Sequence, residues 1–151
     1  MKPRSAAVLA AAFVLLLVGA APAQAQPVSG RTDSGAAYAM GGVSVDDLRE
    51  LERHKDRYTL WITTAARGSG AYLADVQVRI TDARGALLFN QPIPGPWLFI
   101  DLPPGRYTVE AAHQGKPQRR PVQIARSDLR QVVFYFDSAA QVSPEWEKPF
   151  K

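Results

Sequence analysis

The chain offers few of the side chains that do chemistry at enzyme active sites or metal centres. It has no cysteine and two histidines, His54 and His113, which excludes disulfides, thiolate metal sites and cysteine nucleophiles. A zinc site takes three or four ligands at close spacing, and neither histidine has a second histidine near it. His54 falls in the last turn of a predicted helix, and His113 ends a predicted strand. We therefore expect solvent-exposed structural roles for both, with no metal and no cofactor bound.

Serine and carboxylate chemistry is also weakly represented. Ser69 lies in Arg67-Gly68-Ser69-Gly70, which lacks one glycine of the G-x-S-x-G turn that presents a serine nucleophile. A Ser-His-Asp triad stays open at this stage, because its members meet only in space. Asp46 and Asp47 are adjacent and so point to different helix faces, which suits capping rather than acid–base catalysis. We predict no catalytic residue.

The aromatic residues give a more informative pattern, and it concerns binding. In residues 97–102 and 131–137, alternation sends one set of apolar side chains inward on a strand and the other set outward. In residues 58–63, a tryptophan shares the outward face with two threonines. The candidate ligand or partner surface consists of Trp61, Trp97, Phe99 and Tyr135.

Two segments of the chain itself could cover these outward aromatics. One is an amphipathic helix predicted over residues 44–55, whose Leu48 and Leu51 need burial. The other is the C-terminal segment, which offers Trp146 and Phe150. We expect cover from within the chain, with a partner surface as the alternative.

A small basic cluster is predicted at a turn. Lys116, Arg119 and Arg120 form it, with Arg126 and Arg130 nearby. We interpret it as a solvated loop that keeps sheet edges from pairing with other chains. Contact with anionic lipid headgroups or acidic glycans is the alternative.

The net charge argues against a nucleic-acid partner. The 18 basic and 14 acidic residues give a formal charge of +4. Residues 1–25 carry Lys2 and Arg4, so the rest of the chain has 16 basic and 14 acidic residues, or +2. A surplus that small does not hold a polyanion by counterion release.

The N-terminal residues have the layout of a secretory signal peptide. Residues 1–4 are basic, residues 6–18 are an unbroken apolar run, and Ala23-Gln24-Ala25 is an A-x-A cleavage site. The run falls short of the roughly 20 apolar residues that span a bilayer. We predict that residues 1–25 are removed between Ala25 and Gln26, leaving no transmembrane segment. The mature protein is then expected in the periplasm or outside the cell.

The remaining chain divides into a leader, one domain and an arm. Residues 26–42 are rich in Gly, Ser and Ala without periodicity, which predicts a flexible leader. The domain is expected over residues 43–137, beginning with a short helix at 45–55 that Ser44 caps. Residues 138–151 are expected to form a C-terminal arm.

Alternation with a period of two predicts seven strands after this helix. Seven short strands with no helix between them favour an all-β, antiparallel sandwich over a parallel sheet. The expected strands cover residues 58–63, 76–81, 87–91, 97–102, 107–112, 121–125 and 131–137. Tyr107 follows the Pro103-Pro104-Gly105 turn directly, and we expect its ring inward and its hydroxyl bonded to backbone near the turn.

Two quoted stretches carry a family resemblance: YLADVQVRITDARG at residues 72–85 and LPPGRYTV at residues 102–109. They resemble the carboxypeptidase regulatory-like domains, which share a transthyretin-like seven-stranded sandwich. Gly41-Gly42 and Asp46-Asp47 add a likeness to the stand-alone bacterial envelope proteins of that type. The resemblance covers about residues 41–137. It implies a fold and says little about function.

The function expected from these observations is a non-enzymatic, exported β-sandwich module that binds or scaffolds in the cell envelope. An envelope protein or a glycan is the expected partner. One alternative is a small transthyretin-like hydrolase, although the Tyr-Arg-Gly-Ser signature of the related hydroxyisourate hydrolases is absent, since Arg67-Gly68-Ser69 follows Ala66. Another is a carbohydrate-binding module that uses exposed aromatic residues.

Overall fold

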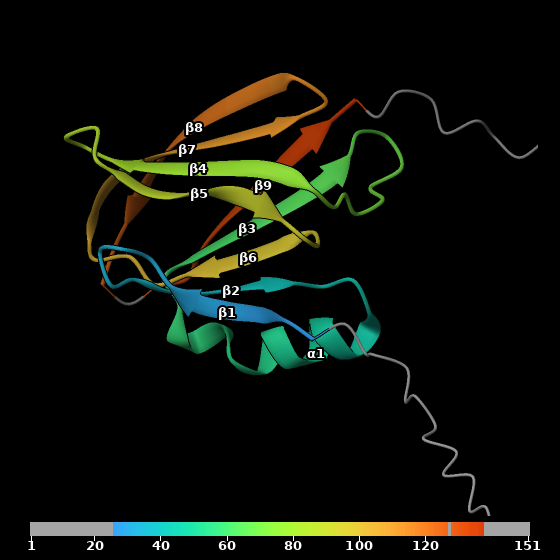
Figure 1. Cartoon of the computed structure of the whole chain (residues 1–151), viewed down its shortest axis with the longest axis horizontal. Coiled ribbons are helices and arrows are strands. Elements are labelled where there is room, and N and C mark those ends of the chain that lie inside the picture. The colour runs from blue at the N-terminus through green and yellow to red at the C-terminus, as the bar shows by residue number, and fades with distance from the viewer. Residues whose placement is uncertain (1–25, 127, 138–151) are drawn as a thin grey trace, which may run out of the picture.

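The computed structural model describes residues 26–126 and 128–137, which form two packed β-sheets and one helix (Figure 1). The predicted signal peptide, Trp146, Phe150 and the predicted arm lie outside these residues. The elements in chain order are β1 (Val28–Arg31), β2 (Ala37–Gly41), α1 (Val45–Arg53), the 3-10 turn η1 (Lys55–Arg57), β3 (Leu60–Ala66), β4 (Val76–Asp82), β5 (Leu87–Ile93), β6 (Trp97–Ile100), β7 (Gly105–His113), β8 (Lys116–Ile124) and β9 (Arg130–Phe136).

The strands form two layers, as expected for an all-β sandwich. One sheet has the order β1-β2-β6-β3-β9, and the other has the order β5-β4-β7-β8. Inward side chains from both sheets make one core, which includes Ile62 of β3, Val78 of β4 and Phe134 of β9. The described residues contain nine strands rather than the expected seven, because β1 and β2 precede the predicted set.

The prediction of a flexible leader at residues 26–42 is wrong for the part that forms β1 and β2. These strands pair as a hairpin, and β2 continues the sheet by pairing with β6. Tyr38 and Met40 point into the core, whereas Ala39 faces outward against the helix side. The alternating positions are the small residues Ala37, Ala39 and Gly41, which are not polar, so the sequence does not show the alternation clearly.

The prediction of a wholly antiparallel sandwich is wrong at one strand pair. β9 runs parallel to β3, from Leu60 opposite Arg130 to Ala66 opposite Phe136. Parallel neighbours need a long connection. Here the segment between the two strands includes the whole four-stranded sheet, so β9 returns to β3 from the opposite layer.

Helix α1 is short, and both its start and its docking have identifiable causes. The Ser44 hydroxyl accepts a hydrogen bond from the Asp47 amide at 3.1 Å, which confirms the predicted cap. The helix ends at Arg53, two residues before the predicted end, and η1 follows. Leu51 is buried and Leu48 packs beside it on the outer face of the five-stranded sheet. A nine-residue helix is marginal in isolation, so this docking holds it.

The backbones of two glycines approach closely where β2 meets β6. A Cβ placed on Gly95 would lie 2.1 Å from the Gly41 carbonyl oxygen, which no side chain tolerates. Gly42 follows with a φ of +92°, in the region that favours glycine. This contact lets the N-terminal hairpin join the sheet directly before β6 begins.

Tyr107 is placed as its position in the sequence predicts. Its ring is 8% exposed within the core cluster, and its hydroxyl donates to the Pro103 carbonyl oxygen at 2.6 Å. The bond ties the start of β7 to the proline turn, which fixes where the chain reverses. Burial raises the pKa of the Tyr107 phenol above its ordinary value of 10.0, and the nearby Asp82 carboxylate raises it further.

The raised pKa of Tyr107 predicts a loss of stability in alkali. The folded chain holds the phenolic proton more tightly than the unfolded chain, so the free energy of unfolding falls as the pH rises above about 10. Tyr107→Phe removes the bond to Pro103, which should cost about 1 kcal/mol at neutral pH. Because the variant has no phenol at this position, its free energy of unfolding should also decrease less as the pH rises. Urea unfolding of both proteins between about pH 8 and pH 11 measures the two effects. Tyr72→Phe, at an exposed tyrosine, is the control, and its free energy of unfolding should decrease with pH as in the wild type.

Candidate functional site

The four predicted surface aromatics differ in their burial. Trp97 and Phe99 are 7% and 0% exposed, so neither is available as a surface residue. Trp61 is half-buried, and Tyr135 is 44% exposed. All four project from the outer face of the five-stranded sheet, because their strand neighbours Ile62, Leu98 and Phe134 point into the core. The outward direction is therefore confirmed, while exposure holds only for Tyr135 and part of Trp61.

A second apolar cluster covers this outer face, and helix α1 is part of it. Ala39, Leu51, Trp97 and Phe99 are its buried members, with Leu48, Tyr58, Trp61 and Leu129 packed against them. The Trp61 and Trp97 rings meet edge to face with centroids 4.9 Å apart, and Trp61 stacks on Phe99 at 5.2 Å. Cover by the helix, which the sequence led us to expect, is confirmed. Cover by Trp146 and Phe150 concerns residues outside those the structure describes.

Along β3 and β9 this outer face is partly exposed: Gln131 and Tyr135 are exposed, whereas Thr63 and Ala65 are buried. Cross-strand pairs place outward side chains together there: Trp61 beside Gln131, Thr63 beside Val133, and Ala65 beside Tyr135. Tyr72 bridges to Ala65 from the following loop and is 52% exposed. None of these side chains is charged. We call this set the uncharged face; its members are Trp61, Thr63, Ala65, Tyr72, Gln131, Val133 and Tyr135.

Three buried polar atoms at or beneath the uncharged face make no hydrogen bond to the rest of the described chain. They are the indole nitrogens of Trp61 and Trp97 and the hydroxyl oxygen of Thr63. Thr63 lies directly opposite Trp97 across the strand pair, and the Trp97 ring contacts the Trp61 ring, so the three side chains are neighbours. A buried donor without an acceptor costs about 1–3 kcal/mol. The side chains that make this region polar, Thr63 and Tyr72, were not among the predicted site residues.

The outer face of the four-stranded sheet has the opposite character. Arg79, Glu110 and Arg119 lie on neighbouring strands there, and the Arg119 guanidinium bonds the Glu110 carboxylate. Gln77 donates to Asn90 at 2.9 Å across a further pair. Such a face is solvated and internally paired, which leaves the uncharged face as the unusual surface of the sandwich.

The predicted basic cluster lies largely on a strand and not at a turn. Lys116, Arg119 and Arg120 belong to β8, an edge strand that also contains Pro117 and Pro121. Arg119 is paired with Glu110, and the Arg120 guanidinium carbon lies 5.1 Å from the centre of the Phe134 ring. Charges and prolines on an edge strand disfavour pairing with another chain, in line with the expected role.

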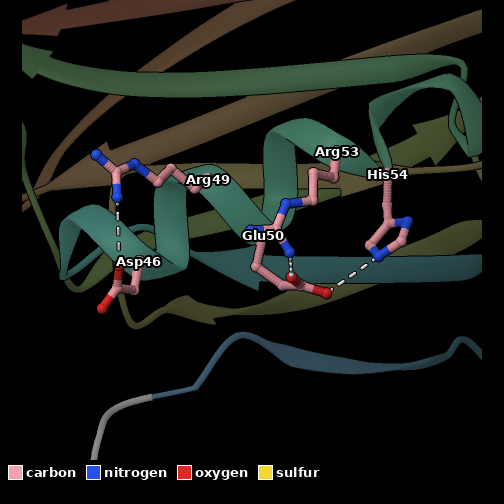
Figure 2. A network of polar contacts seen from close by, with 5 residues as sticks. All are labelled: Asp46, Arg49, Glu50, Arg53 and His54. Carbon is pink, nitrogen blue, oxygen red and sulfur yellow. Dashed lines mark hydrogen bonds and ion pairs between the residues drawn. The ribbon is translucent and has the colours of Figure 1, made fainter.

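A groove of about 810 Å³ runs between α1 and the β1–β2 hairpin. Charged side chains of the helix line it, and Figure 2 shows their network. The Glu50 carboxylate accepts a bond from Arg53 at 3.0 Å and lies 3.0 Å from His54 Nε2. Asp46 and Arg49 form a looser pair at 3.8 Å. Pairs within the helix thus involve most of the charged side chains in this groove.

The two histidines lie on different elements and have different neighbours. His54 contacts Glu50 at the end of the helix, and the His113 ring lies 5.6 Å from the Phe136 ring. The Ser69 hydroxyl accepts a bond from the Ala71 amide at 3.2 Å within its own loop. Within residues 26–126 and 128–137, no group of three or more His, Asp or Glu side chains is arranged to hold a metal ion.

No known protein-family pattern matches the chain, and no curated protein matches it. Among the residues that the structure describes, no helix is both long and apolar enough to cross a membrane. The candidate site is therefore defined by its own geometry: an uncharged, partly aromatic sheet face with unpaired hydrogen-bond donors beneath it.

The burial of Trp97 predicts that it stabilises the fold. Trp97→Ala should lower the free energy of unfolding by about 3–5 kcal/mol, because the cavity would lie under α1 and beside Trp61. Tyr135→Ala, on the same outer face but exposed, should cost less than about 1 kcal/mol. Chemical denaturation of both variants measures the difference. Equal, small decreases in the free energy of unfolding of both variants would show that α1 does not bury this cluster.

Proposed function

We propose that the chain is exported and that the mature protein is a non-enzymatic β-sandwich module. It binds a partner or ligand of the cell envelope, in the periplasm or outside the cell. We also propose that it is similar to the carboxypeptidase regulatory-like, transthyretin-like domains. The Pro103–Tyr107 bond and the turn at Asp82, which lie in the two stretches that carry the resemblance, support this similarity. The Asp82 carboxylate accepts bonds from the Arg84 and Ala86 amides, each at 2.9 Å.

The observation that carries the proposal is the uncharged face. Exposed aromatic side chains that gather on one side of a sheet are typical of contact surfaces. Tyr72 and Tyr135 are half-exposed at its surface, and unpaired donors lie beneath them. Aromatic side chains with a polar tip are typical of contact surfaces, because they bury large areas and still offer a hydrogen bond.

The leader supports export, and the cleavage position can be measured. Signal peptidase requires small residues before the cut, and Ala23 and Ala25 supply them. Expressed with its own leader in a bacterial host, the protein should be recovered from the periplasm or medium with Gln26 as its first residue. Intact mass and N-terminal peptide sequencing measure this. A full-length chain held in the cytoplasm would contradict export.

Tyr72 and Tyr135 are the side chains whose loss should affect binding without unfolding the protein. Both are exposed, so Tyr72→Ala and Tyr135→Ala together should leave the thermal midpoint nearly unchanged. Truncating two aromatic anchors should weaken binding to an envelope component by about tenfold or more, at roughly 1–2 kcal/mol each.

The matched control for this double variant lies on the opposite sheet. Gln77→Ala and Asn90→Ala remove a polar pair from the outer face of the four-stranded sheet and should leave binding unchanged. Biosensor titration of purified mature protein against fractionated envelope glycans and proteins compares the three proteins. Equal affinities in the wild type, the tyrosine double variant and the control double variant would show that the uncharged face is not the binding site.

One observation favours a glycan over a protein as the ligand, which makes a carbohydrate-binding module the second candidate. Sugars present apolar C–H faces together with hydroxyl acceptors. The uncharged face exposes the aromatic rings and hydroxyl groups of Tyr72 and Tyr135, which suit both features of a sugar. Binding to neutral oligosaccharides on an array, lost in the Tyr72 and Tyr135 variant, would support this candidate. Binding only to protein fractions would reject it.

A further inference from the structure

Asp47 is a buried residue in a helix whose other acidic residues are more exposed, and its side chain lines the groove between α1 and the hairpin. Its residue exposure is 3%, whereas the side chain of Asp46 on the same turn is 84% exposed. Buried carboxylates are normally paired or hydrogen-bonded, because removing the charge from water is costly. Within the described chain, however, no hydrogen bond or ion pair reaches the Asp47 carboxylate; only its amide is bonded, to Ser44.

The carboxylate of Asp47 points toward the start of the N-terminal hairpin. Asp47 Oδ2 lies 3.6 Å from the place where a Cβ on Gly41 would be, and the Cα of Pro27 lies 3.3 Å from that same place. Gln26 and Asp47 also line the same groove between the helix and the hairpin. The unpaired acid and the backbone that precedes β1 are therefore close neighbours.

The cations of the groove are largely committed elsewhere. Arg49 pairs with Asp46, and Arg53 and His54 both contact Glu50 (Figure 2). Arg57 also lines the groove, and no ion pair joins it to Asp47. Among the described residues, no ion pair joins any of these cations to Asp47.

We propose that Asp47 forms a binding site for an α-ammonium group, and that its occupant is the N-terminus of the mature chain. This inference rests on the proposed cleavage after Ala25. Before cleavage the nitrogen of Gln26 is an uncharged amide; after cleavage it is an ammonium that carries three donors. Pairing with Asp47 then ties the residue before β1 to the first turn of α1. Signal removal would thereby complete the contact between the hairpin and the helix.

The side chain of Gln26 provides a chemical readout of this pairing. A free N-terminal glutamine cyclises when its unprotonated α-amine attacks the side-chain amide carbon. A new C–N bond forms, the bond to the amide nitrogen breaks, and ammonia leaves. Pairing with a carboxylate keeps the amine protonated and raises its pKa, so the docked N-terminus should cyclise slowly.

The experiment compares cyclisation in the mature protein and in variants. Each protein is made in the cytoplasm behind a tag, and a protease that leaves Gln26 as the first residue removes the tag. This route does not depend on export, so its outcome is separate from the test of signal cleavage. Loss of ammonia is followed by intact mass near pH 7. Asp47→Asn should cyclise several-fold faster than wild type, by about tenfold for each unit by which pairing raises the amine pKa.

Asp46→Asn is the matched control, because it removes an exposed charge from the same helix turn and should cyclise at the wild-type rate. Wild-type protein unfolded in urea is a second comparison, which needs no variant to fold, and it should cyclise as fast as folded Asp47→Asn.

An extra alanine before Gln26 moves the ammonium by about 3.8 Å and should lower the thermal midpoint of wild type but not of Asp47→Asn. Equal cyclisation rates in folded wild type, Asp47→Asn and unfolded wild type would overturn the inference.

Discussion

Strand β6 is the constraint on which the rest of this structure depends. All four of its residues, Trp97 to Ile100, are buried, so it needs cover on both faces of its sheet. The inner face is covered by the opposite sheet, as in any sandwich. The outer face requires an additional layer, and α1 supplies it together with Tyr58 and Leu129. The β1–β2 hairpin also depends on β6, because β2 pairs with the edge of β6 that β3 leaves free.

This arrangement makes the two outer faces of the sandwich unequal. The four-stranded sheet presents crossed polar pairs such as Gln77 with Asn90, and needs no cover. The five-stranded sheet is apolar on both sides, and its helix covers only the part near β2 and β6. The β3–β9 part is left with exposed tyrosines above buried, unpaired donors. A helix that stops at Arg53 therefore both stabilises the sheet and determines which surface stays open.

Local patterns in the sequence were enough to predict the features with local causes. The Ser44 cap and the bond from Tyr107 to its preceding turn each depend on residues only a few positions apart. The outward direction of Trp97 and Phe99 also followed from alternation. Their burial did not, because exposure depends on where a distant helix docks.

The errors in prediction have a similar physical origin. The hairpin at residues 28–41 was missed because glycine and alanine occupy most of its outward positions, which removes the contrast that alternation requires. The parallel pairing of β9 is a property of topology that no single segment encodes. Asp46 and Asp47 are alike in the sequence, and only burial in three dimensions distinguishes them.

The pairing of β3 with β9 sets the order in which the molecule can be completed. Paired residues of the two strands, such as Leu60 and Arg130, are 70 positions apart, and no bond between the strands can form before β9 is in place. Contacts between such distant segments form slowly, because the closure of a long loop precedes any gain from the contact. For a chain made from its N-terminus, the β3 edge of the sheet stays unpaired until residues 130–136 have been made. The topology that completes the five-stranded sheet thus leaves β3 with an open edge until β9 joins it.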